Sequence, residues 1–106
     1  MPTYLWKVSY TTKGAEGILA EGGTGRRAAI TKALESLGGR LESFHYALGE
    51  DDAYLIADLP DDTAAAALSM RVAAGGGART TTVPLLTPEQ MDEATKRGVT
   101  YTPPGS

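Results

Sequence analysis

The sequence has no cysteine, and only one of its 106 residues is a histidine. The absence of cysteine excludes disulfide scaffolds, thiolate zinc sites, iron–sulfur clusters and cysteine nucleophiles. A single histidine without cysteine supplies too few nitrogen or sulfur ligands for zinc. We therefore expect neither a bound metal nor a cofactor.

A strong charge of one sign and long apolar runs are also lacking. Ten basic and thirteen acidic residues give a net charge of −3, which offers no basic surface to nucleic acid or to an anionic membrane. No apolar run approaches the ~20 residues that span a bilayer, and the first residues, MPTYLWKVSY, do not resemble a secretion signal. We expect a soluble cytoplasmic domain without nucleic-acid or membrane partners.

Composition and pattern predict one α+β domain. Hydrophobic residues make up 42% and charged residues 22%, as in ordinary globular proteins. Aromatic, β-branched and alternating residues predict four strands, at 4–10, 40–48, 53–57 and 78–86. Capping residues and glycine pairs predict a short helical segment before Gly22, a longer helix from Thr24 to about Leu37, a helix over 62–74 and a short helix after Thr87.

The order β-α-β-β-α-β is that of a ferredoxin-like sandwich, an antiparallel four-stranded sheet with both main helices on one face. We assign residues 1–97 to this domain, including the short C-terminal helix, and 98–106 to an extended tail. Pro84 indicates that the fourth strand ends there or lies at an edge of the sheet, because proline donates no hydrogen bond to a neighbouring strand.

Helices on one side leave the other face of the sheet without cover. Strand alternation places Trp6 on one face and Leu5 and Lys7 on the other, so apolar side chains occur on both faces. The helix at 62–74 is apolar nearly all round, although alanine-rich helices are also tolerated at surfaces. These patterns favour a homodimer or a higher oligomer.

The run GGRLESFHYALGEDD, residues 38–52, resembles the centre of the GYD domain family of small bacterial proteins. Segments at 1–4, 21–27, 57–62 and 85–91 extend the resemblance over about residues 1–95. It implies a dimeric α/β barrel in which two ferredoxin-like sheets face each other, and it brings no established activity. The turn after which the family is named reads Gly49, Glu50, Asp51 and Asp52 here, with Asp51 in place of the aromatic residue.

The candidate ligand-binding residues lie on the predicted strands, and they are Trp6, Lys7, Ser9, His45, Tyr54 and Arg79. His45 is a candidate general acid or base, because only histidine has an ordinary pKa near neutrality; the alternative is a surface or interface histidine. Lys7 would attract a carboxylate or stabilise an enolate, and Arg79 would help to hold the anion. The alternative for Lys7 is a packed stem with its ammonium group in water.

Two further groups of residues have competing interpretations. The acidic turns, including Asp51 and Asp52, offer oxygen ligands to calcium, but no EF-hand spacing is present. The segment Gly22–Arg27 combines glycines with two arginines that would suit a phosphate, yet it matches neither a Walker A loop nor a dinucleotide fingerprint. A flexible joint before a helix explains the same residues.

The sequence therefore favours a small homo-oligomeric binding or accessory module, with a small-molecule pocket between two facing sheets. One alternative is a cofactor-free monooxygenase or isomerase, in which Trp6, Tyr10, Tyr46 or Tyr54 would hold a substrate ring and His45 or Lys7 would move a proton. The other is a purely structural oligomer.

Overall fold

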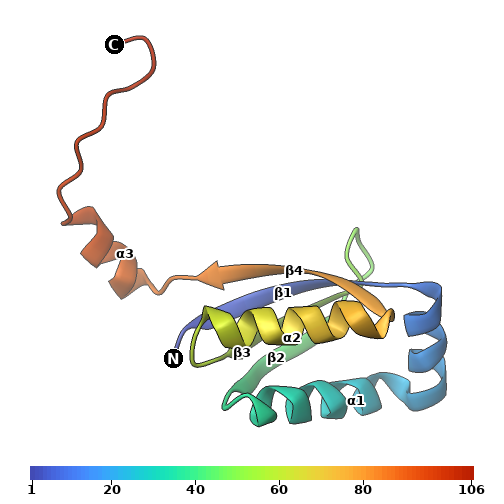
Figure 1. Ribbon diagram of the computed structural model, residues 1–106. Helices are drawn as coiled ribbons and strands as arrows, with labels where there is room; N and C mark the ends of the chain where they lie inside the picture. Colours follow the sequence, from blue (N-terminus) through green and yellow to red (C-terminus); the bar gives the residue numbers. More distant parts are fainter.

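The computed structural model describes residues 1–106 and contains one antiparallel sheet with two long helices on the same face (Figure 1). The elements in chain order are β1 (Thr3–Tyr10), α1 (Thr12–Ser36), β2 (Arg40–Tyr46), β3 (Ala53–Asp58), α2 (Asp62–Gly75), β4 (Ala78–Leu85) and α3 (Pro88–Thr95). The strands lie in the order β2-β3-β1-β4. The predicted ferredoxin-like α+β fold is confirmed.

The even-numbered residues of β1 face the helices. Tyr4, Trp6 and Val8 are buried, whereas Leu5 and Lys7 between them are only half-buried. This difference follows from strand alternation, since successive side chains point to opposite faces of the sheet. The core thus lies between the sheet and the helices, and its buried hydrophobic members are Tyr4, Trp6, Val8, Leu34, Ala53, Leu55, Ala57, Leu59, Ala65, Leu68 and Ala78.

Helix α1 consists of two segments that meet at Gly22, where φ is 81° and the backbone is not helical. Glycine adopts this left-handed region without the steric cost of a Cβ atom. In Figure 1 the first segment turns at the end of the sheet, and the second runs along β2. Two segments were predicted, but the second begins at Gly23, so Thr24 lies inside the helix and is not its N-cap.

The other helix ends follow the predicted capping chemistry. The Asp61 side chain accepts a hydrogen bond from the Ala64 amide, and Gly76 ends α2 in the left-handed conformation with φ 73°. Thr87 and Gln90 form a capping box at the start of α3. Hydrogen bonds between near neighbours in the sequence decide these ends, which is why they were predictable.

An irregular register in β2 decides which way its side chains point. Leu41 pairs with Ala57 and Ser43 with Ile56, so the register shifts between Leu41 and Ser43. The extra residue lets both Leu41 and Phe44 face the helices and turns His45 to the opposite face. The strand ends at Tyr46, two residues earlier than predicted. Strand β4 lies at the sheet edge, as Pro84 indicated.

The C-terminal part of the chain projects from the body of the fold. Figure 1 shows α3 and the residues after it leading away from the sheet. Residues 98–106 contain no helix or strand, and Met91, Val99 and Tyr101 are exposed. No helix of the chain combines the length and the apolarity needed to cross a bilayer.

Candidate functional site

The face of the sheet opposite the helices, here called the open face, carries a polar row across its strands. Lys7 on β1 is paired with Tyr54 on β3, and Tyr54 is paired with His45 on β2. Thr81 on β4 is the other partner of Lys7. Directly opposed side chains in antiparallel strands are close neighbours, so the row brings an amine, a phenol and an imidazole together.

An aliphatic row lies next to the polar one. Leu5 is paired with Ile56 on one side and with Val83 on the other, and all three are half-buried. Leu85 is half-buried two residues further along β4. The open face is therefore divided into an aliphatic strip and a polar strip that cross the same strands.

The turn between β2 and β3 is attached to the end of β1 by Asp52. Its carboxylate accepts a hydrogen bond from the Tyr10 amide at 2.8 Å, and its own amide donates to the Val8 carbonyl at 2.8 Å. These bonds satisfy backbone groups beyond the end of β3, so Asp52 has a structural role. Gly49 and Glu50 lie exposed at the tip of the turn.

Asp51 brings a carboxylate to the polar strip. It accepts hydrogen bonds from the Tyr54 hydroxyl at 3.3 Å and from the Ser9 hydroxyl at 3.5 Å. Partial burial, and then the negative charge of Asp51, raise the pKa of the Tyr54 phenol. The residue that replaces the aromatic of the family's turn thus contacts two of the predicted ligand-binding residues.

A buried carboxylate lies at the other end of the open face. Asp58 accepts hydrogen bonds from the Thr3 hydroxyl at 2.6 Å and from Arg40 Nε at 3.0 Å. The Thr3 hydrogen bond, assisted by Arg40, lowers the pKa of the Asp58 carboxyl. Since its oxygens are occupied by residues of the same chain, Asp58 joins three strands rather than binding a ligand.

Five of the six predicted ligand-binding residues share the open face. Ser9 is paired with Arg79 next to the row that contains Lys7, Tyr54 and His45. Trp6 lies on the other face, where it is 2% exposed and its indole Nε1 donates to the Ser69 hydroxyl at 3.2 Å. The structure therefore does not bring Trp6 together with the other five.

The aromatic residues proposed to hold a substrate ring are divided in the same way. Tyr10 and Tyr46 lie near each other on the helix side, with ring centroids 6.5 Å apart, and only Tyr54 is on the face of His45 and Lys7. The acidic turns do not bring together three or more side chains of the types that bind metals.

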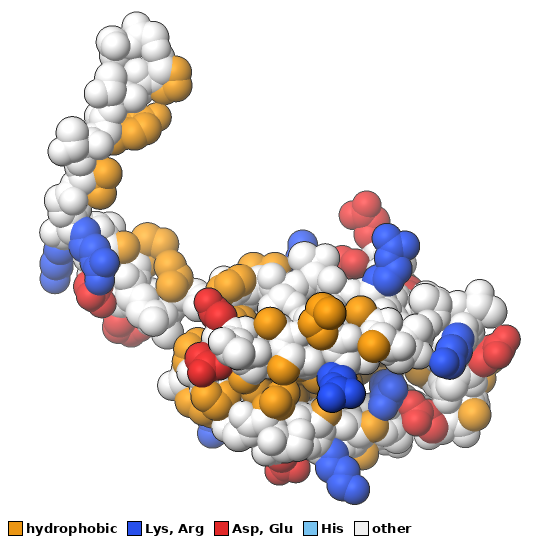
Figure 2. Space-filling view, viewed as in Figure 1, with side chains coloured by type: hydrophobic (Ala, Val, Ile, Leu, Met, Phe, Trp, Pro, Cys, Tyr) orange, Lys and Arg blue, Asp and Glu red, His pale blue; other side chains and the backbone are white.

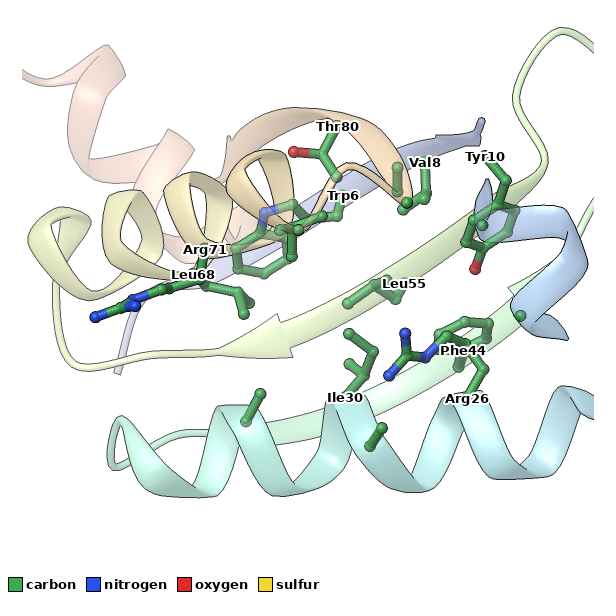
Figure 3. A pocket seen from close by; sticks show the side chains of 18 of the residues that line it. Trp6, Val8, Tyr10, Arg26, Ile30, Phe44, Leu55, Leu68, Arg71 and Thr80 are labelled. Carbon is green, nitrogen blue, oxygen red and sulfur yellow. The ribbon is translucent and has the colours of Figure 1, made fainter. Parts of the chain in front are cut away.

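Sequence reasoning missed a cleft of about 450 Å³ on the helix side (Figure 3). Arg26 and Arg71 line it together with apolar residues of both helices. Two signals in the sequence pointed to it: Arg71 interrupts an otherwise apolar helix, and Arg26 belongs to the glycine-rich segment Gly22–Arg27. That segment was considered as a phosphate loop, but it lies within α1 around the break at Gly22.

The GYD domain family model matches residues 4–95, from the second residue of β1 to the last residue of α3. The chain belongs to the GYD domain family. Comparisons with curated proteins and with solved structures found no match. Within this GYD domain, the turn that contains Asp51 and Asp52 attaches the β2–β3 hairpin to β1 and borders the polar strip.

Proposed function

We propose that this GYD-domain protein is a homo-oligomeric module that binds a small anionic molecule between two facing sheets. The observation that carries this proposal is the division of the open face into an aliphatic strip and a polar strip. In a pair of copies the aliphatic strips would exclude water, and the polar strips would line the enclosed space.

The chemistry of the polar strip favours an anion. Lys7 and Arg79 are cations that form no salt bridge within the chain, and His45 offers a hydrogen bond. The hydroxyls of Ser9 and Tyr54 would donate to an anion in place of their long hydrogen bonds to Asp51. A carboxylate or phosphate placed there would be held by charge-assisted hydrogen bonds. The Asp51 carboxylate beside Ser9 would repel a ligand with a second negative charge at that position. A molecule with one compact anionic group is therefore preferred.

The oligomer is tested by Leu5→Asp, with Leu19→Asp as the matched control. Leu5 is at the centre of the aliphatic strip, whereas Leu19 is 87% exposed on α1. Light scattering should give the wild type and Leu19→Asp at least twice the 11.1 kDa mass of one chain. Leu5→Asp should give a single chain. A wild type that stays monomeric at millimolar concentration would exclude the proposal.

Anion binding is tested by titrating succinate and inorganic phosphate while following backbone amide shifts by NMR. We expect shifts around Lys7 and Arg79, and at least tenfold weaker binding after Lys7→Ala or Arg79→Ala. Lys96→Ala, on the exposed residue that follows α3, should bind like the wild type. An oligomer that takes up neither anion would instead support a purely structural role.

A proton-transfer enzyme is the second candidate function, because His45, Tyr54 and Lys7 lie in one row. A cofactor-free monooxygenase or isomerase would use His45 or Lys7 to accept a proton from a bound substrate. Replacing each residue by alanine should then abolish turnover while the oligomer persists. Full turnover in both variants would remove these residues from the mechanism.

A further inference from the structure

The cleft between α1 and α2 lies on the side of the sheet away from the proposed oligomer contact (Figure 3). Its volume of about 450 Å³ is within the range of small-molecule pockets. Trp6, Val8 and Leu55 form its floor, and the facing sides of the two helices form its walls. It is therefore a separate cavity with its own lining.

The cleft exists because the two helices cover opposite edges of the sheet. Helix α2 packs mainly on β4, and α1 packs mainly on β2, which are the two edge strands. The residues of α1 that face the gap include Ala29 and Ala33, whose short side chains do not fill it. The central strands β1 and β3 thus form the bottom of a groove instead of a closed core.

The lining suits a flat apolar molecule. Eleven of the twenty residues around the cleft are hydrophobic. Four hydrophobic side chains above the buried floor are only partly buried, so their surfaces remain available for contact. They are Tyr10, Ile30, Phe44 and Val72. Aromatic rings pack well against other rings, and Phe44 on β2 and Tyr10 on β1 both line the cleft.

The charges in the cleft are the reverse of those of the whole chain. Lys13, Arg26 and Arg71 line it with a single acid, Glu21, whereas the chain has a net charge of −3. Lys13 is already engaged, since its ammonium donates to the Gly75 carbonyl at 3.0 Å. Arg71 forms no salt bridge within the chain. Figure 2 shows basic side chains beside apolar ones over the gap between the helices.

Arg26 is the central cation of the cleft. Figure 3 shows its guanidinium reaching from α1 into the cleft, beside Phe44 and on the side of Ile30. Its Nε is 3.3 Å from the Glu21 carboxylate but is buried and makes no hydrogen bond. Glu21 thus forms a salt bridge with Arg26 but does not satisfy the buried Nε donor, which is costly to leave without a hydrogen bond. A planar carboxylate is the group that a guanidinium binds best.

We infer that the cleft between α1 and α2 binds a small aromatic carboxylate, with its ring against Phe44 and Ile30 and its carboxylate on Arg26. Arg71 on α2 is exposed and also lines the cleft, although Figure 3 shows its guanidinium directed away from Arg26. This site does not depend on the proposed function, because none of Lys7, Ser9, His45, Tyr54 or Arg79 lines it.

The test uses 2-naphthoate as the probe and its neutral analogue 2-naphthamide as the matched control. Calorimetry should show saturable binding of 2-naphthoate, with amide shifts at Ile30, Phe44 and Val72, and at least tenfold weaker binding of 2-naphthamide. Arg26→Gln should weaken 2-naphthoate binding at least tenfold. Arg97→Gln should leave it unchanged, because Arg97 pairs only with Glu93 on α3.

Two further variants keep the test independent of folding and of the oligomer. Ile30→Trp fills the cleft but leaves Arg26 in place, and it should abolish binding. Lys7→Ala changes only the open face and should leave the amide shifts at Ile30, Phe44 and Val72 as in the wild type. The inference is overturned if no saturable binding occurs at millimolar probe, if Arg26→Gln or 2-naphthamide binds as well as its counterpart, or if amide shifts occur around Lys7 and Tyr54 and none occur at Ile30, Phe44 and Val72.

Discussion

The two faces of the sheet are formed by the same strands, but the two long helices lie on only one of them. On the helix side the aromatic residues have polar partners within the chain: the Tyr4 hydroxyl donates to Asp62 at 2.6 Å and the Trp6 indole donates to Ser69 at 3.2 Å. On the open face Lys7 and Arg79 form no salt bridge, and the aliphatic strip around Leu5 is half-buried. The buried aromatic residues of the helix side therefore maintain the fold, whereas the two cations of the open face have no salt-bridge partner within the chain.

The largest expected difference between the faces is that between Trp6→Ala and Lys7→Ala, two neighbours on β1. Trp6 is the largest buried side chain, and its removal leaves a cavity, so we expect a loss of about 3–5 kcal/mol in the free energy of unfolding. Lys7→Ala should change it by less than about 0.5 kcal/mol. Urea unfolding followed by far-UV circular dichroism measures both, and similar losses would contradict the assignment of the faces.

Asp58 is the exception on the open face, because it is buried and hydrogen-bonded. Asp58→Asn should lower the free energy of unfolding by about 1.5–3 kcal/mol at pH 7, since the bonds from Thr3 and Arg40 are made to a charged carboxylate. Asp51→Asn should lower the free energy of unfolding far less, because the hydrogen bonds that the Asp51 carboxylate accepts are 3.3 and 3.5 Å long.

This loss should depend on pH in a defined direction. The pKa of Asp58 is lowered in the folded chain. The ionised carboxylate therefore contributes fully to the free energy of unfolding above its pKa in the unfolded chain, about 3.9, and this contribution is lost as pH falls through its pKa in the folded chain. Urea midpoints of the wild type and Asp58→Asn should therefore converge below about pH 4. A difference between the two urea midpoints that stays constant down to pH 2 would contradict the lowered pKa of Asp58.

A third comparison uses two glycines of α1, one facing the body of the fold and the other facing open space. A Cβ atom at Gly14 would collide with the backbone carbonyl of Gly77, while one at Gly17 would meet nothing within 4 Å. Gly14→Ala should therefore lose about 1–3 kcal/mol of stability. Gly17→Ala should gain about 0.5–1 kcal/mol, because alanine is the better helix former. Thermal unfolding should show a lower midpoint for Gly14→Ala and a higher midpoint for Gly17→Ala than for the wild type.

Short-range chemistry made most of the fold predictable from the sequence. The ends of α2 and α3 depend on Asp61, Thr87 and Gln90, which bond to backbone groups three residues away. Alternation along β1 correctly separated Trp6 from Lys7 and Ser9. The position of Pro84 indicated an edge strand, because an edge needs fewer backbone donors.

The sites were less predictable, because they depend on contacts between distant segments. The register shift after Leu41 turns His45 to the open face, and no local pattern marks it. The cleft depends on how far α1 stands from α2, which is set by packing on opposite edge strands. Sequence reasoning therefore found five residues of the open face but not the arrangement of Arg26, Phe44 and Ile30.

The smallest expected effect compares one tyrosine on each face. Tyr4→Phe removes a 2.6 Å hydrogen bond to Asp62 and should cost about 0.5–1.5 kcal/mol. Tyr54→Phe removes a 3.3 Å bond on an exposed residue and should cost less. Urea unfolding at pH 7 measures both, and an equal loss would mean that the Asp62 contact adds nothing.

Alkaline titration separates the same two residues by their ionisation. The hydrogen bond to Asp62 and burial raise the pKa of Tyr4 to about 12, so folding holds this phenol neutral. The neutral phenol contributes fully to the free energy of unfolding below the pKa of Tyr4 in the unfolded chain, about 10. This contribution is lost as pH rises towards 12. In absorbance at 295 nm, Tyr4→Phe should remove a component that titrates near pH 12. Loss of a component near pH 10 instead would show that Tyr4 is exposed and that its hydrogen bond to Asp62 does not form.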